Sequence, residues 1–383
     1  MAIHFEAAEL AERRRRACAA MTKRGLDGLL MFRQESMYYL TGYDTFGYVF
    51  FQCLYLGADG KMTLITRAPD LRQAQHTSVI EDIRIWVDGP DANPSLELRG
   101  ILAEHGCKGR KLGVEWEAYG LTARNGQRLA AALDGFCALE DASDLVSRLR
   151  VVKSPAELVY VRRAAELADA AWEEAQRLAS PGAFEGDILA AMHGAVFRGG
   201  GDDPGNEFII GSGRDALLCR YFSGRRKLDQ EDQLTLEFAG TYRHYHSCLM
   251  RTLRIGTLPP AQAEMHKVAR EALLACEDAL KPGRPISEVF DAHVRVLDGA
   301  GYARHRLNAC GYSLGTTFAP NWMDWPMFYK DNPVIAEPGM VFFLHMIILD
   351  SESGLAMTLG RTSEVTPSGA KPLSKAPLDM VVK

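Results

Sequence analysis

The first part of the chain alternates between two hydrophobic periods. Residues 1–24 place apolar side chains at helical spacing, and residues 26–32 form a short apolar run that predicts a strand. After an aromatic segment, strand-like and helix-like stretches alternate as far as residue 150. The predicted strands are 61–66, 83–87 and 111–114, and the predicted helices are 69–77, 94–105 and 121–133. This alternation is typical of an α/β domain.

Residues 36–56 are unusually rich in tyrosine and phenylalanine. Part of this segment is predicted to form a pair of strands packed on the core. Residues 40–48 (LTGYDTFGY) combine aromatic with turn-forming residues, which is typical of a loop that closes over a ligand. Tyr43 and Phe46 are therefore candidate substrate contacts.

A domain boundary is predicted near residue 153. Ser154 can cap a helix, Pro155 suits its first position, and Glu157 completes a capping box. With 383 residues the chain is long enough for two domains, predicted here as 1–153 and 154–383. The second domain is predicted to contain helices at 156–178, 185–198, 260–280 and 287–300, and strands at 208–211, 340–349 and 355–365.

Residues 234–252 (LTLEFAGTYRHYHSCLMRT) predict two strands joined by a polar turn at 242–246. Apolar residues alternate with polar or small ones, so Glu237 shares a face with small side chains, where a cavity could form. His244, His246, Cys248 and Arg251 follow within the same hairpin. A surface hairpin with a polar tip is the alternative interpretation, because short motifs carry a false-positive risk.

Composition narrows the class of protein. A net charge of −5 and a pI near 6.1 argue against a nucleic-acid or anionic-membrane binder. Eight cysteines without CxxC spacing are typical of reduced thiols in a cytosolic protein. The N-terminal residues do not have the pattern of a signal peptide, and we expect a cytoplasmic protein without a membrane-spanning segment.

The C-terminal third carries three further motifs. Residues 311–315 (GYSLG) form a glycine-bracketed turn or strand, and residues 337–340 (EPGM) lead into an apolar strand that contains His345. A lone histidine in such a strand is usually a satisfied core residue. The last predicted strand contains Arg361.

Taken in order, the hairpin, the GYSLG turn, the EPGM strand and the RTSEVTPSG strand resemble the creatinase/prolidase/methionine-aminopeptidase family. The segment LVSRLRVVKSPAELVYVRRAAELAD resembles the linker that leads into the catalytic half of that family. The resemblance spans nearly the whole chain. It implies an α+β protein with a pita-bread catalytic domain, preceded by a smaller α/β domain of the creatinase N-terminal type.

The metallopeptidases of this family bind two divalent ions through five side chains. Their positions fall, in order, on Glu237, Cys248, Tyr312, His345 and Gly360. Hard divalent ions need oxygen anions, and only one carboxylate remains here. We therefore expect no metal and no cofactor. A single zinc ion on Glu237, Cys248 and His345 is the chemically possible alternative.

Other members of the family cleave small C–N bonds without metal. The segments MYYLTGYDTFGYVFFQC, YRHYH and PNWMDW resemble the ectoine-hydrolase branch. The resemblance implies hydrolysis of a non-peptide C–N bond in a small polar metabolite, such as an amidine, a guanidino acid or a cyclic amide. The alternatives are an Xaa-Pro-type metallopeptidase and a non-catalytic member that binds a small ligand. Family members also imply a homodimer.

The proposed roles follow from side-chain chemistry. Glu237 is the candidate base or cation-binding group, with His345 or His246 as an acid/base partner. Cys248 is a candidate nucleophile if a histidine lowers its pKa, and a passive small residue otherwise. Tyr312 is a candidate donor to a developing oxyanion.

Substrate binding is assigned to cationic and aromatic side chains. Arginine forks bind carboxylates in two-point contacts. Arg251 also has a structural alternative, because the family keeps an arginine there. The candidate substrate-binding residues are Arg220, Arg251, Arg361, His244, Tyr43, Phe46 and Trp325.

Overall fold

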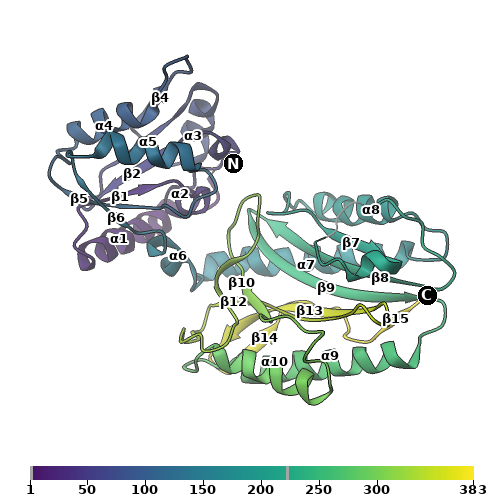
Figure 1. The fold of residues 1–383 in the computed structure, drawn as a ribbon. Helices are drawn as coiled ribbons and strands as arrows, with labels where there is room; N and C mark the ends of the chain where they lie inside the picture. The colour runs from purple at the N-terminus through teal and green to yellow at the C-terminus, as the bar shows by residue number, and fades with distance from the viewer. Residues whose placement is uncertain (1–2, 221–223) are drawn as a thin grey trace. The chain divides into compact units, whose positions relative to one another are not determined.

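The structure of the protein is a computed structural model that describes residues 3–220 and 224–383. The chain divides into two compact units, residues 1–150 and 151–383. Each unit has a β-sheet with helices packed against it (Figure 1).

The N-terminal unit is built on a six-stranded sheet with the strand order β4-β3-β2-β1-β5-β6. β2 pairs antiparallel with both β1 and β3, and the remaining pairs are parallel. The strands are β1 (Gly28–Met31), β2 (Cys53–Gly57), β3 (Met62–Arg67), β4 (Ile83–Trp86), β5 (Lys111–Val114) and β6 (Ala138–Asp141). The helices are α1 (Ala7–Lys23), α2 (Gln34–Thr41), α3 (Leu71–Thr77), α4 (Pro94–Glu104), α5 (Ala123–Leu133) and α6 (Leu145–Arg150), with short 3-10 turns at Gly47–Val49 and Ala68–Asp70.

The aromatic segment 36–56 differs from its prediction. Its first part is helix α2, and only β2 is a strand, so the predicted strand pair is wrong there. Glu115, which follows β5, is fully buried, and its carboxylate accepts the backbone N–H groups of Phe32 and Arg33 and the hydroxyl of Ser36. These bonds satisfy donors at the start of α2. The helix start therefore depends on a residue far away in the sequence.

The C-terminal unit contains a nine-stranded sheet whose main order is β11-β10-β12-β13-β9-β8-β7. β14 pairs with β13, and β15 pairs with β9. The strands are β7 (Ile209–Ser212), β8 (Asp232–Tyr242), β9 (Tyr245–Ile255), β10 (Gly311–Ser313), β11 (Asp324–Met327), β12 (Val341–Asp350), β13 (Leu355–Thr366), β14 (Gly369–Pro372) and β15 (Val381–Val382). The helices are α7 (Pro155–Leu178), α8 (Glu185–Arg198), α9 (Pro260–Ala279) and α10 (Ser287–Gly299), with a 3-10 turn, η3, at Gly213–Leu217.

The helices of this unit cover the sheet in two pairs. α7 contacts β8 and β9, and α9 contacts β12 and β13, so each helix pair covers a different part of the sheet (Figure 1). α7 begins with the predicted capping box of Ser154 and Glu157. Within the described ranges, no helix combines the length and the apolar character needed to cross a membrane.

β8 and β9 form a long hairpin whose register is continuous from Asp232–Ile255 to Tyr242–Tyr245. Arg243 and His244 form the two-residue turn, with φ values of 49° and 64°. Positive φ at both positions is the geometry of a type I′ turn, which matches the twist of the paired strands. The predicted turn at 242–246 is therefore too long, and His246 lies within β9 rather than at the tip.

We expect Glu115→Ala to destabilise the N-terminal unit by at least about 3 kcal/mol, because it leaves several buried donors without an acceptor. Urea unfolding and amide hydrogen exchange at Phe32 and Arg33 measure the effect. Glu117→Ala is the control, since that side chain is 78% exposed in its ion pair with Arg33 and is expected to contribute less than about 1 kcal/mol. Equal effects of the two substitutions would contradict the assignment.

Candidate active site

The register of the sheet places one row of side chains on a single face. Glu237 pairs with Met250, Met250 with Gly360, and Gly360 with His345. Paired residues of antiparallel strands share a face. Tyr312 joins the same face, because it pairs with Phe343, two residues before His345.

This face borders a cavity of about 350 Å³. Four of the predicted site residues line it: Glu237, Tyr312, His345 and Arg220. The remaining lining residues are mostly apolar or amide side chains: Asn206, Ile209, Cys219, Leu307, Asn308, Ala309, Asn321, Trp322, Met323, Met327 and Ile347. The cavity therefore combines one carboxyl group with a histidine, an arginine and several neutral hydrogen-bonding groups.

Hydrogen bonds connect Glu237 to two aromatic side chains. The indole N–H of Trp322 donates to the Tyr312 hydroxyl (2.8 Å), and this hydroxyl donates to Glu237 Oε1 (3.2 Å). An indole N–H can only donate, so the single Tyr312 proton is directed to Glu237. Tyr312 is thus already engaged by the carboxylate, whereas the sequence interpretation assigned its proton to a substrate oxyanion.

Burial controls the protonation of Glu237 and His345, which both line the cavity. Burial raises the pKa of Glu237 to about 7, and the Tyr312 hydrogen bond and the Arg220 charge oppose this rise only in part. Burial lowers the pKa of His345 to about 3, with a smaller contribution from His293. His345 is therefore a neutral imidazole near pH 7, and its buried Nδ1 has no hydrogen-bond partner among the described residues.

Cys248 lies in the same sheet face but does not meet the condition for a nucleophile. Its thiol is fully buried, and burial together with the Glu237 charge raises its pKa well above the ordinary value. A thiol is reactive as its thiolate, and here that form is disfavoured. The passive alternative of the sequence analysis fits this environment.

His246 supports the cavity wall instead of lining it. Its Nε2 accepts the Gly205 N–H (2.8 Å), so its proton lies on Nδ1, which donates to Thr317 Oγ1 (3.1 Å). Burial lowers the pKa of His246 to about 3. The predicted acid/base role of His246 is not compatible with a ring whose two nitrogens are both engaged by protein groups.

Two of the three predicted arginines lie on the opposite face of the sheet. Arg251 donates to the Gly360 carbonyl (2.6 Å), and its guanidinium lies over the Trp172 ring of α7. Arg361 forms a two-point pair with Glu277 of α9. Their assignment to substrate binding was wrong because neighbouring residues of a strand point to opposite faces.

The other predicted contacts lie elsewhere in their own units. His244 stacks on Phe318 at 4.2 Å, and Trp325 packs against a hydrophobic core cluster; neither lines the cavity. Tyr43 is fully buried, and its hydroxyl donates to Gln52, so it has no surface to offer a ligand. Phe46 is 74% exposed, and its role stays a prediction.

Trp322, which is 2% exposed in the cavity wall, was not among the predicted site residues. The PNWMDW segment did indicate a tryptophan at the site, but it contains two, and Trp325 was predicted as the substrate contact instead of Trp322. Asn206 was missed as well. Its Oδ1 accepts the Trp322 backbone N–H (3.2 Å), a contact between segments distant in sequence.

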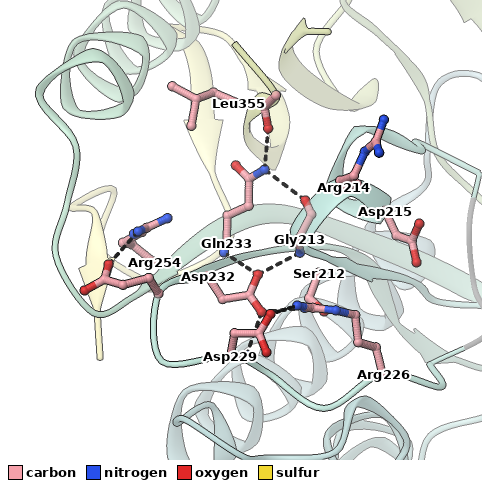
Figure 2. A pocket seen from close by; sticks show the side chains of 12 residues that line it. Ser212, Gly213, Arg214, Asp215, Arg226, Asp229, Asp232, Gln233, Arg254 and Leu355 are labelled. Atoms are coloured by element: carbon pink, nitrogen blue, oxygen red, sulfur yellow. Dashed lines mark hydrogen bonds and ion pairs between the residues drawn. The ribbon is translucent and has the colours of Figure 1, made fainter. Parts of the chain in front are cut away.

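A second hollow, of about 520 Å³, lies where η3 and the ends of β8 and β9 meet (Figure 2). Two arginines at this hollow are paired with carboxylates: Arg226 with Asp229 and Asp232, and Arg254 with Glu231. Asp232 accepts bonds from the backbone of Gly213, Gln233 and Asp229 and from Arg226. These bonds join the turns at this end of the sheet, so we interpret the polar groups of this hollow as structural. In the smaller cavity, by contrast, the buried Nδ1 of His345 has no hydrogen-bond partner among the described residues.

The chain belongs to metallopeptidase family M24. The family model matches residues 159–367, and the model of the creatinase/prolidase N-terminal domain matches residues 13–152. The chain is thus a hydrolase of this family, and the predicted α+β fold with a pita-bread catalytic domain is confirmed.

Three similar proteins illustrate the range of the family. The chain is 28% identical to the uncharacterized hydrolase/peptidase y4tM of Sinorhizobium fredii, covering 100% of this chain and 99% of that protein. It is 26% identical to the ectoine hydrolase of Halomonas elongata, with the same coverage. The crystal structure of dipeptidase PepE from Mycobacterium ulcerans is 26% identical and has a TM-score of 0.85, covering 99% of each chain.

The donor set does not fit the two metal ions that the family name implies. At the fifth ligand position, a Cβ on Gly360 would lie 2.8 Å from the Leu344 carbonyl oxygen and 2.9 Å from the Phe343 ring, so no carboxylate side chain has room there. Among the described residues, no three His, Cys, Asp or Glu side chains are grouped so that they could hold a metal ion. This also leaves the single-zinc alternative on Glu237, Cys248 and His345 without a ligand cluster.

We expect the stability of the wild-type protein to fall, relative to Glu237→Gln, as pH rises from about 4.5 to about 7. The folded protein binds the Glu237 proton more tightly than the unfolded chain does, and the difference between 4.5 and about 7 corresponds to about 3 kcal/mol. Unfolding free energies measured at several pH values test this. Glu271→Gln, an exposed site on α9, is the control, and a pH-independent difference for Glu237→Gln would contradict the assignment.

Proposed function

We propose that the protein hydrolyses a C–N bond other than a peptide bond in a small polar metabolite, such as an amidine, a guanidino acid or a cyclic amide, without a metal ion. The observation that carries this proposal is Glu237. It is a buried carboxyl group with a pKa of about 7, in a cavity whose other residues lack the donors for two metal ions. The full-length similarity to an ectoine hydrolase supports the same reaction class.

In the proposed reaction, Glu237 accepts a proton from water as the water oxygen bonds to the electrophilic carbon. The C–N bond then breaks, and the same proton passes to the leaving nitrogen, so that one water molecule is added in total. A carboxyl group with a pKa near 7 suits both transfers, because neither its acid nor its base form is strongly favoured at neutral pH. His345, as a neutral imidazole, is the second polar side chain proposed to contact the reacting atoms.

The cavity favours a small substrate that carries an acidic group. Its volume of about 350 Å³ is near the lower end of the usual range for ligand pockets. Arg220 lines the cavity and is exposed, so it can bind a substrate carboxylate. Asn206, Asn308 and Asn321 supply neutral donors and acceptors.

The setting of the reaction is also a proposal. We place the enzyme in the cytoplasm as a homodimer, with no nucleic-acid or membrane partner, in keeping with its net charge of −5. The aromatic loop that carries exposed Phe46 is proposed to close over the site of the neighbouring subunit in this dimer.

A dipeptidase is the second candidate function, and the similarity to the PepE structure favours it. That reaction in this family would need the metal ligands that these positions lack. A third candidate, a non-catalytic member that binds a small ligand, would show stabilisation by ligand without turnover.

The direct test is turnover of a panel of cyclic amidines, guanidino acids and lactams by the wild-type protein and by Glu237→Gln. We expect the substitution to lower kcat by about 10²- to 10⁴-fold, the usual contribution of a general base. Glu271→Gln removes an exposed glutamate from the same unit and is expected to keep full activity. Retention of activity in Glu237→Gln would exclude this residue as the base.

The pH dependence provides an independent check. The base must be deprotonated to accept a proton, so kcat/KM is expected to rise with pH through an apparent pKa of about 7. Steady-state rates between pH 5 and pH 9 would measure this rising part of the pH–rate profile. If kcat/KM instead rose with an apparent pKa of 4.5, the ordinary value of glutamate, a different, solvated group would control the rate.

A further inference from the structure

Trp322 lies between β10 and β11 and belongs to a line of three buried groups. Its Nε1 is 2.8 Å from the Tyr312 hydroxyl, which is 3.2 Å from Glu237 Oε1. The three side chains are 2%, 4% and 8% exposed. The indole N–H can only donate, so it fixes the direction of the first bond, and the Tyr312 hydroxyl is the donor in the second.

The backbone of Trp322 is held on both sides. Its N–H donates to Asn206 Oδ1 (3.2 Å), and its carbonyl accepts from Thr317 Oγ1 (3.4 Å). Thr317 is in turn bonded to His246, which accepts the Gly205 N–H. A Cβ on Gly205 would lie 3.0 Å from the Asn321 backbone, so the two segments are in close contact. The indole donor is therefore presented from a rigid part of the cavity wall.

The two carboxylate oxygens of Glu237 differ in their hydrogen bonds. Oε1 accepts the Tyr312 proton, whereas no described protein group donates to Oε2. If Tyr312 were free to rotate, its hydroxyl could accept from Glu237 or turn towards the cavity. The bond from Trp322 occupies one acceptor position of the hydroxyl and keeps its proton pointed away from the indole, and in the structure this proton points to Glu237 Oε1.

We propose that Trp322 is a positioning residue that holds the Tyr312 proton on Glu237 Oε1 and thereby reserves Oε2 for the substrate or its attacking water. This inference rests on the proposed function and refines it. The proton taken from water is accepted at Oε2 and returned from Oε2 to the leaving nitrogen. Trp322 itself touches no reacting atom in this scheme.

The alternative is that Trp322 only fills space in the cavity wall. Packing and positioning make different predictions for a double-mutant cycle. A packing role persists when the Tyr312 hydroxyl is removed, because the indole ring still contacts its neighbours. A positioning role that acts through Tyr312 disappears with that hydroxyl.

The kinetic test compares the wild-type protein with Trp322→Phe, Tyr312→Phe and the double variant. We expect each single substitution to lower kcat about tenfold, the effect of about one hydrogen bond, with a smaller change in KM. The double variant is expected to be no slower than Tyr312→Phe alone. Tyr329→Phe, at a 47% exposed tyrosine next to β11, is the control and is expected to keep wild-type rates. Additive losses would overturn the inference.

A spectroscopic test needs no substrate. In ultraviolet resonance Raman spectra, the indole N–H band of one tryptophan is expected to move to its unbonded position in Tyr312→Phe and to be missing in Trp322→Phe. Tyr329→Phe is expected to leave it unchanged. If the band does not move in Tyr312→Phe, the inference is wrong whether or not the protein turns over a substrate. If the band moves but Glu237→Gln remains active, the hydrogen-bond chain exists and the proposed function fails.

Discussion

The register of the β8–β9 hairpin is the constraint on which the site depends. Side chains alternate between faces with a period of two, so a slip of one residue would turn Glu237 towards the helices and bring Arg251 to the cavity face. The two-residue turn at Arg243 and His244 fixes the pairing at one end. The pairing of Met250 with Gly360 then carries the same register to β13, and onwards to His345 on β12.

The site retains a buried carboxyl group whose neighbours offset the cost of burial only in part. Tyr312 donates one hydrogen bond, and the positive charge of Arg220 also favours the carboxylate form. Arg251 and Arg361 do not neutralise Glu237, because backbone carbonyls and Glu277 hold them on the helix side of the sheet. The remaining desolvation raises the pKa of Glu237, and this makes the group a candidate for proton transfer near neutral pH.

Local patterns predicted what depends on local geometry. The strand alternation placed Glu237 on a cavity face, and the order of the motifs predicted the fold. The same alternation places Arg361 on the other face of the sheet. Arg361 was nevertheless predicted to bind substrate, because it lies next to a ligand position of the family. Two other predictions failed for a different reason. Trp325 was predicted as a site residue, but Trp322 lines the cavity. A strand was predicted where Glu115 satisfies the first donors of helix α2. Both depend on contacts between segments that lie far apart in the chain.

In the proposed function, Glu237 performs the hydrolysis without a bound metal. The most direct measurement is the metal content of the purified, active protein, by inductively coupled plasma mass spectrometry, with turnover measured on the same sample after chelation. We expect far less than about one metal ion per chain and unchanged turnover. About two divalent ions per chain, with turnover lost on chelation and restored by manganese or cobalt, would contradict it.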